Sequence, residues 1–201
     1  MRKRIAVFAS GYGSNLQALI DFNEKDDLNG DIVIVFSNNA HAFALKRAKK
    51  HKIKAVHKDP GEYASREEFE KDILGILKDN KVDLIVLAGY MFLLTPLLVN
   101  AYKARILNIH PALLPSFRGT HGIKDAYDYG VKISGVTVHF VDEQLDNGPI
   151  IMQAPVYIAS DDDIESFEAK IHEVEHKIYP LAVKLFCLGK LKIAGRKVDI
   201  L

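Results

Sequence analysis

Short runs of aliphatic and β-branched residues alternate along this chain with longer segments in which apolar residues recur every three or four positions. The first pattern is typical of buried strands and the second of amphipathic helices. Their alternation predicts an α/β fold: a mostly parallel, twisted sheet with helices on both faces. The expected strands are residues 5–9, 32–36, 54–57, 84–87, 106–109, 135–141 and 150–158.

Two helices have recognisable boundaries. Ser65 and Glu68 have the spacing of a capping box and precede a helical apolar repeat, which predicts a helix over residues 65–80. Three acids at 161–163 suit the N-terminus of a long C-terminal helix. We expect this last helix to kink at Pro180 and to end near Gly189, followed by a loose tail.

Two polar residues stand at strand spacing in the otherwise apolar segment 107–115, LNIHPALLP. Side chains alternate along a strand, so Asn108 and His110 share one face while their neighbours face the core. Pro111 ends the pairing and places both residues at the carboxyl end of the strand, where open parallel sheets bind ligands. We expect them to hold an oxyanion; the alternative is hydrogen bonding to local backbone.

Asp146 is the best partner for this pair, because a carboxylate near His110 would favour the charged imidazole and accept a proton. The acid also precedes an Asn-Gly-Pro turn, so a turn-forming role stays open. His121 and His139 are secondary candidates. His139 lies in a strand and suits a satisfied core position, whereas His121 lies in a loop that could close over a ligand.

The segment GYGSN at residues 11–15 joins the first strand directly to the first helix. Glycine amides, a helix N-terminus and a serine hydroxyl suit a phosphate, although a plain tight turn fits equally well. The segment makes the N-terminal half Rossmann-like without a dinucleotide fingerprint, because Leu16 replaces the third glycine and the second strand lacks a terminal acid. A phosphate monoester is therefore favoured over a dinucleotide.

Composition and charge narrow the partners. The 201 residues are 48% hydrophobic, and 27 basic against 26 acidic residues give a net charge of +1, with no general reason for nucleic-acid or membrane binding. A basic run at 46–58 suits a solvated helix face better than RNA. The single Cys187 fits a reducing cytoplasm and a buried position. The apolar stretch after the basic start is too short for a signal peptide. We expect a cytoplasmic protein that acts on small molecules.

The segment HEVEH at residues 172–176 matches a zinc-binding pattern on a helix. No His or Glu follows it, so a third ligand from the downstream chain is missing, and catalytic zinc usually has three protein ligands. We therefore predict no metal.

Taken in order, these segments resemble the phosphoribosylglycinamide formyltransferase family of purine biosynthesis. The resemblance covers nearly the whole chain and implies a single domain over residues 1–201, with a phosphate-binding half (1–100) and a catalytic and folate-binding half (101–201). It rests on GYGSN (11–15), FSN (36–38), SRE (65–67), LAGYM (87–91), LNIHPALLP (107–115), VHFV (138–141), the Asp146 turn and EHKIYP (175–180).

The resemblance implies transfer of a formyl group from the co-substrate 10-formyltetrahydrofolate to an amine. Asn108 and a charged His110 would hold the oxyanion, and Asp146 would sustain that charge and move the proton through water. Glu175 would bind the substrate's amino end. The phosphate would lie against Gly13, Ser14 and Asn15. The folate would contact Arg66, Met91, Phe92, Leu93, Leu94, Asn108, Asp142, Glu143, Gln144, Leu145 and Asp146.

Three residues depart from the pattern that the resemblance implies: Tyr12 stands where some relatives have Asn, Phe92 stands for Arg and Asn147 for Gly. The first two would alter the grip on ligands, while Asn147 tolerates a left-handed turn. The alternatives are a methionyl-tRNA formyltransferase and a formyltetrahydrofolate hydrolase, whose added domains the 201 residues leave no room for, and an inactive folate- or nucleotide-binding module. We expect a monomer or a homodimer.

Overall fold

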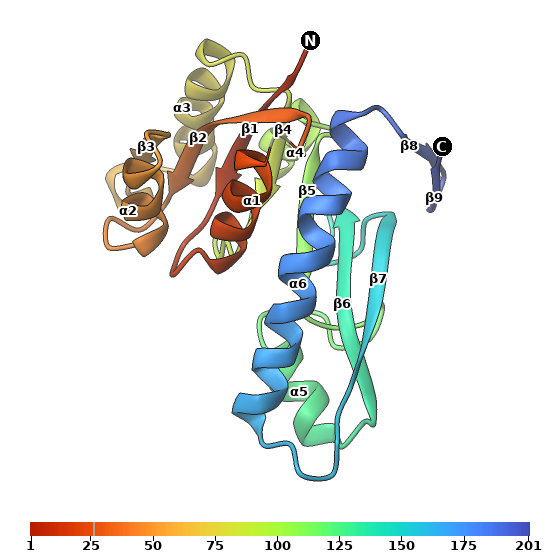
Figure 1. Ribbon diagram of the computed structural model, residues 1–201. Coiled ribbons are helices and arrows are strands. Elements are labelled where there is room, and N and C mark those ends of the chain that lie inside the picture. Colours follow the sequence, from red (N-terminus) through yellow and green to blue (C-terminus); the bar gives the residue numbers. More distant parts are fainter. Residues whose placement is uncertain (26) are drawn as a thin grey trace.

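The computed structural model describes residues 1–25 and 27–201. Its central sheet has seven strands: β1 (Lys3–Phe8), β2 (Gly30–Ser37), β3 (Lys54–His57), β4 (Leu84–Leu87), β5 (Ile106–His110), β6 (Ile133–Phe140) and β7 (Ile150–Tyr157). Their order is β3-β2-β1-β4-β5-β6-β7 (Figure 1). The first five are parallel, and β6 and β7 pair antiparallel. The predicted α/β fold with a mostly parallel sheet is confirmed.

Helices cover both faces of this sheet because side chains alternate along each strand. The helices are α1 (Ser14–Glu24), α2 (Phe43–Lys50), the short η1 (Pro60–Glu62), α3 (Arg66–Asp79), α4 (Pro96–Ala101), α5 (Gly122–Tyr129) and α6 (Ile164–Cys187). In β1, Ile5 and Val7 join the core under α1, α2 and α6, whereas Ala6 and Phe8 join the core under α3 and α4.

In the part of the chain described, no helix has the length and apolar character needed to cross a membrane.

Local signals in the sequence account for most helix ends. The Ser65 hydroxyl accepts a hydrogen bond from the Glu68 backbone N–H at 3.1 Å, and α3 begins at the next residue, as the capping box predicts. Asp163 caps α6 in the same way through the Ser166 N–H. Cys187 is buried, and burial raises its pKa to about 12, which agrees with its predicted place in the core.

The C-terminal residues correct the expectation of a loose tail. They form a hairpin of β8 (Leu191–Ala194) and β9 (Lys197–Ile200), paired antiparallel in a sheet of their own. The turn contains Gly195 with φ +62°, a conformation that glycine adopts without strain. Each strand is only four residues long, which made the pattern easy to miss in the sequence.

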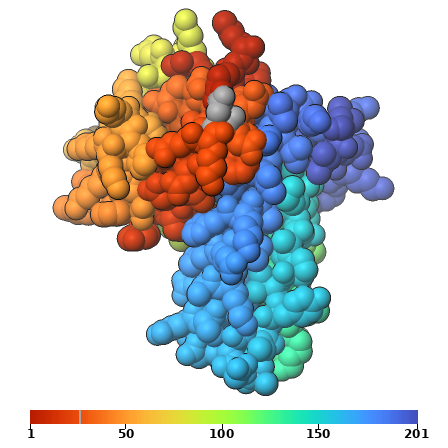
Figure 2. All heavy atoms as spheres, viewed as in Figure 1, coloured from red at the N-terminus to blue at the C-terminus, as the bar shows by residue number. Residues whose placement is uncertain are grey.

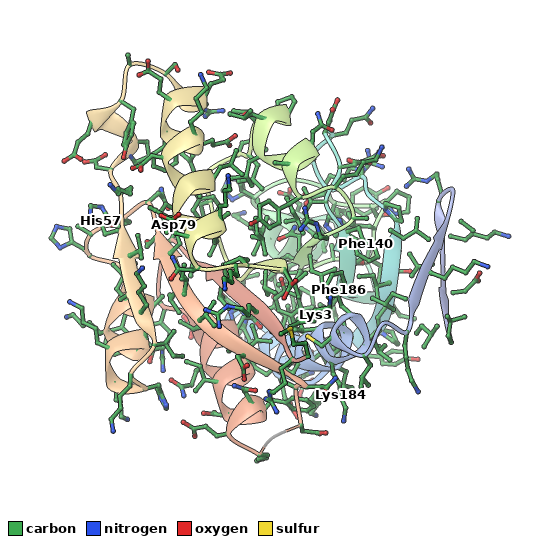
Figure 3. The ribbon with its side chains drawn as sticks, turned by 90° about the horizontal axis from the view of Figure 1, so that it is seen from above. Lys3, His57, Asp79, Phe140, Lys184 and Phe186 are labelled. Carbon is green, nitrogen blue, oxygen red and sulfur yellow. The ribbon has the colours of Figure 1, made fainter. Side chains whose placement is uncertain are left out.

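The long helix α6 connects the two halves of the sheet. It runs through Pro180 to Cys187 and lies against α1 (Figures 1 and 2). Near its C-terminal end, the Phe186 ring lies 6.4 Å from the Phe140 ring of β6 (Figure 3). The fully buried Tyr179 donates its hydroxyl to the Leu87 carbonyl at 2.7 Å and lies 3.1 Å from the Leu107 carbonyl. The helix is therefore tied to β4 and β5, the strands on which the candidate site stands.

On the other face, Glu70 of α3 holds the start of α4. Its carboxylate is buried and accepts hydrogen bonds from the Thr95 hydroxyl, the Thr95 N–H at 2.7 Å and the Leu98 N–H at 3.3 Å. Burial raises the pKa of Glu70 in spite of these bonds. The carboxylate satisfies backbone donors that the first turn of a helix leaves without intrahelical partners.

We predict that Glu70→Ala lowers the free energy of unfolding by about 2–4 kcal/mol, because it leaves buried donors at Thr95 and Leu98 unpaired. Urea denaturation followed by circular dichroism measures this change. The matched control is Glu67→Ala, an exposed acid on the same helix, which should change stability by less than about 0.5 kcal/mol. Equal effects of the two substitutions would contradict the anchoring role of Glu70.

Candidate functional site

The candidate site begins at the carboxyl end of β5. The strand ends at His110, before Pro111, as predicted. Leu107 and Ile109 are buried in the core under α6, while Asn108 and His110 occupy the alternate positions. Pairing with β6 then sets His139 directly opposite Asn108. Adjacent strands thus bring together polar side chains that lie 31 positions apart in the sequence.

Asp146 completes this cluster from the loop between β6 and β7. Its Oδ2 atom lies 3.4 Å from His110 Nδ1, and its Oδ1 atom lies 3.4 Å from Asn108 Nδ2 and 3.7 Å from His139 Nε2. The Gly119 N–H donates to Oδ2 at 2.9 Å. Burial alone would raise the pKa of Asp146, but these partners together hold it below its usual value. The carboxylate is therefore ionised at neutral pH.

The turn that carries Asp146 differs from the sequence prediction in one detail. Asp146 itself has a left-handed backbone, with φ +47°, and its neighbour Asn147 does not. Asn147 instead binds through its side chain: its amide nitrogen donates to Asp142, and its amide oxygen accepts from Arg118 at 3.2 Å. The residue in the usual glycine position thus fixes the turn by hydrogen bonds.

His110 is enclosed on both sides of its ring. Its Nε2 atom lies 2.7 Å from the Phe117 carbonyl oxygen, and its Nδ1 atom faces the Asp146 carboxylate. Only a doubly protonated ring donates to both acceptors. Burial nevertheless lowers the pKa of His110, because desolvation outweighs the attraction of Asp146 and the Phe117 carbonyl. Asp146 and the Phe117 carbonyl thus favour the charged ring predicted from the sequence, and burial opposes it.

His139 orients the carboxamide of Asn108. The His139 Nδ1 atom donates to the Phe140 carbonyl at 2.8 Å, because a carbonyl can only accept. Its Nε2 atom lies 3.2 Å from Asn108 Nδ2, which is a donor. The sequence suggested a core position for His139, and the residue is indeed buried, but it also belongs to the polar cluster. His121 is exposed at the start of α5 and stands outside this cluster.

The loop after β5 contributes backbone groups that sequence reasoning did not find. Phe117 has φ +51° and directs its carbonyl at His110, and Gly119 has φ +97° and donates its N–H to Asp146. A Cβ atom on Gly122 would lie 3.2 Å from His110 Nε2, so the loop packs tightly over the imidazole. Backbone contacts of this kind leave no signal in residue identity except the glycines themselves.

A second group of candidates lies at the start of α1, in the glycine loop (residues 11–15). Gly13 has φ +74° and precedes the helix, and no side chain in the described chain caps it. A Cβ atom on Gly13 would lie 2.9 Å from the Ala44 Cβ, so only glycine fits this approach. Uncapped N–H groups at a helix N-terminus, together with its dipole, form an anion site.

Glu175 of α6, which the resemblance assigns to the substrate's amino end, reaches this helix start. The buried Glu175 Oε2 atom accepts from Asn15 Nδ2 and interacts with His172 Nδ1, both at 2.9 Å. The hydrogen bond to Glu175 raises the pKa of His172, although part of its ring is exposed. The Asn15 Oδ1 atom is buried with no hydrogen-bond partner within the described chain, so it is an acceptor available to a ligand.

A cavity of about 450 Å³ opens beside the glycine loop, between α1, α2 and α6. Its lining combines two basic side chains, one acidic side chain, a hydroxyl and two apolar side chains. Its lining residues are Ser14, Gln17, Ala18, Asp21, Phe22, Lys25, Arg47 and His176. Ser14 is thus the one predicted phosphate-binding residue that lines this cavity.

Most of the predicted folate residues fall on two loops, whereas Arg66 begins α3 and Asn108 lies in β5. Met91 and Leu93 are exposed on the loop after β4, and the Arg66 guanidinium lies 4.7 Å from the centroid of the Phe92 ring. Leu145 is exposed on the loop after β6. Three other predicted residues of that loop line a separate cavity of about 300 Å³ against α4: Asp142, Glu143 and Gln144.

The two histidines of the zinc-binding pattern make other contacts. His172 and His176 stack on α6 with their ring centroids 6.4 Å apart, and His172 pairs with Glu168 and Glu175. Residues 1–25 and 27–201 contain no group of three or more His, Cys, Asp or Glu side chains placed to hold a metal ion.

Comparison with known proteins adds family relationships to this geometry. The family model described as "Formyl transferase" matches residues 3–183. Phosphoribosylglycinamide formyltransferase of Escherichia coli is 40% identical over 189 residues, which are 94% of this chain and 89% of that protein. The crystal structure of glycinamide ribonucleotide transformylase 1 from Symbiobacterium toebii is 44% identical, with a TM-score of 0.97, over 99% of this chain and 94% of that one.

Other relatives are longer than this chain. It spans 14% of the trifunctional purine biosynthetic protein adenosine-3 of Chironomus tentans, at 43% identity over 96% of its own length. A formyltetrahydrofolate deformylase from Pseudomonas syringae has a TM-score of 0.91 at 30% identity, and this chain covers 66% of it. The same fold therefore occurs in proteins whose names describe two different reactions.

The Glu175–His172 pair predicts a pH-dependent part of stability. The pKa of His172 is higher in the folded protein than in the unfolded chain, where it is about 6.5. The ion pair therefore stabilises the fold fully at pH values below about 6.5, and this stabilisation is lost as the pH rises through the pKa of the folded state. His172→Gln should therefore lower the free energy of unfolding by about 0.5 kcal/mol at acidic pH, a value reduced for exposure, and by less at pH 9.

Urea denaturation of both proteins at pH 5.5 and at pH 9 measures this difference. The matched control is His57→Gln, since His57 is exposed at the end of β3 and points away from the sheet (Figure 3). A destabilisation by His172→Gln that is the same at both pH values would refute the ion pair.

Proposed function

Because the chain belongs to the formyl transferase family, we propose that it transfers the formyl group of 10-formyltetrahydrofolate to the amine of 5′-phosphoribosylglycinamide, in purine biosynthesis. The observation that carries this proposal is the cluster of the half-buried Asn108 with the buried His110 and Asp146 at the carboxyl end of β5. A binding module has no need of an ionisable pair beside an oxyanion position. The bacterial relatives that match this chain over nearly their whole length support the choice of substrate.

In the proposed complex, the glycine loop binds the phosphate. Gly13, Ser14 and Asn15 present backbone N–H groups at the start of α1, where the helix dipole favours an anion. Glu175 binds the amino end of the substrate through its carboxylate. The unpartnered Asn15 Oδ1 atom supports a ligand donor at this point.

The chemical step needs a donor pair for the oxyanion. The substrate amine attacks the formyl carbon, the carbonyl π electrons move to oxygen, and a tetrahedral intermediate forms. Asn108 and His110 donate hydrogen bonds to that oxygen, which requires His110 Nε2 to exchange the Phe117 carbonyl for the developing charge. The bond from carbon to the folate nitrogen then breaks, and the nitrogen takes up a proton.

Asp146 helps to move the proton that this step transfers from the amine to the leaving nitrogen. The attacking amine must lose one proton and the leaving nitrogen must gain one. Asp146 is ionised and lies 3.4 Å from both Asn108 and His110, so it can accept a proton through water and stabilise a charged imidazole while the oxyanion exists. Its left-handed backbone conformation is held by Arg118 and Asp142 through Asn147.

The folate would contact the loops after β4 and β6. Exposed apolar side chains at Met91, Leu93 and Leu145 suit the ring system, and the cation of Arg66 suits a carboxylate of the glutamate tail. Phe92 stacks with Arg66 in this chain, so the aromatic ring limits the directions in which the guanidinium points.

We also propose that the protein is a cytoplasmic enzyme, that its substrates are small molecules, and that it works as a monomer or a homodimer.

The proposal predicts that purified protein releases tetrahydrofolate from 10-formyltetrahydrofolate only when phosphoribosylglycinamide is present. Absorbance of the released tetrahydrofolate measures the rate, and chromatography measures the formylated ribonucleotide in equal amount. Release at the same rate without the glycinamide would identify hydrolysis instead, the reaction that the deformylase relative is named for.

A second prediction concerns His110. His110→Ala removes one oxyanion donor and should lower kcat at least about a hundredfold. Circular dichroism and urea denaturation should show a folded protein, because the residue lies at the end of its strand. His57→Ala, at the far edge of the sheet, is the control and should keep full activity. Unchanged kcat in His110→Ala would remove this residue from the mechanism.

A further inference from the structure

Arg47 of α2 bridges two parts of the chain that flank the glycine loop. Its Nε atom donates to the Tyr12 carbonyl at 3.0 Å, and its NH1 nitrogen donates to Gln17 Oε1 at 2.9 Å. The Gln17 N–H in turn donates to the Gly13 carbonyl at 3.0 Å, in the first turn of α1. One guanidinium therefore spans the segment whose amide groups face the proposed phosphate.

Two aromatic rings fix the plane of this guanidinium. Its central carbon lies 4.6 Å from the centroid of the Tyr12 ring and 4.9 Å from that of Phe43. The two rings stack on each other at 5.3 Å with an interplanar angle of 10°. The Tyr12 ring thus contributes to holding Arg47. The planar fork of arginine makes these two bonds from separate nitrogens in a fixed geometry, which the compact ammonium of lysine does not reproduce.

The start of α2 supports the loop at a further point. The Ala44 N–H donates to the Gly11 carbonyl at 3.1 Å, and the Ala44 Cβ lies 2.9 Å from the position that a Cβ atom on Gly13 would take. The loop is thus fixed on both sides of the left-handed Gly13. An anion site whose donors are already fixed loses less conformational entropy on binding than one whose loop must first order.

We propose that Arg47 is a positioning residue that holds the glycine loop in its anion-binding conformation and so gives the enzyme its preference for a phosphorylated substrate. This inference rests on the proposed function. Arg47 and Ser14 line the same cavity, so the positive charge also stands beside the loop. The phosphate gains from fixed amides and from this charge, whereas a ribosylglycinamide without phosphate gains from neither.

The test compares Arg47→Met with the wild-type protein on two substrates, phosphoribosylglycinamide and the same compound without its phosphate. We expect KM for the phosphorylated substrate to rise about tenfold, the order expected for the loss of a charge-assisted hydrogen bond, with kcat within about twofold. The kcat/KM for the unphosphorylated compound should stay the same. Lys49→Met removes a charge from the same helix at an exposed position and should change neither value.

Arg47→Lys separates position from charge. It should recover only part of the preference for phosphate, because it keeps the charge and loses the fork. Full recovery by lysine, equal losses for both substrates, or an unchanged KM in Arg47→Met would each overturn the proposal. If Arg47→Met does not fold, Gln17→Ala removes one of the two bonds and should raise the same KM by a smaller factor.

Inorganic phosphate gives a readout independent of the reaction. Millimolar phosphate should raise the Tm of the wild-type protein and of Lys49→Met, and should raise that of Arg47→Met markedly less. If the wild-type protein fails to formylate the ribonucleotide while this difference persists, the proposed function is wrong and the role of Arg47 stands. Equal shifts in all three proteins would overturn the role of Arg47 itself.

Discussion

The buried carboxylate of Glu175 is the contact on which the site depends. It comes from the last long helix, accepts a hydrogen bond from Asn15 at the start of the first one, and lies one turn from Tyr179, which binds the Leu87 and Leu107 carbonyls. A buried charge without partners is strongly destabilising, so this contact enforces the position of α6. These contacts fix the C-terminal half of the chain in position against the N-terminal half.

The order of the strands in the sheet explains why groups from distant parts of the sequence meet at the candidate site. The glycine loop follows β1, the loop with Met91 follows β4, and Asn108 and His110 end β5, so parallel strands present all three at one edge. Ser10 links two of these loops, because its hydroxyl accepts from the Met91 N–H at 2.9 Å and its N–H donates to the Gly89 carbonyl. The antiparallel β6 then brings His139 and the Asp146 loop back to β5.

The sequence was informative wherever a local rule applied. Alternation along 107–110 placed Asn108 and His110 on one face, and the capping box placed the start of α3. The sequence did not predict contacts that depend on a backbone group or on burial in the tertiary structure. The Phe117 carbonyl over His110 comes from a loop conformation that residue identity does not encode, and the four-residue strands of the C-terminal hairpin were too short to carry a clear pattern.

The charge of His110 depends on such a balance of tertiary effects. Asp146 and the Phe117 carbonyl favour the imidazolium, and burial of the ring opposes it more strongly. In the proposed reaction this balance changes when negative charge develops on the formyl oxygen. When the oxyanion develops beside it, a second negative charge is added to that of Asp146, and the pKa of the imidazole must rise. In that reaction the hydrogen bond from His110 to the oxygen would therefore be stronger at the transition state than in the ground state.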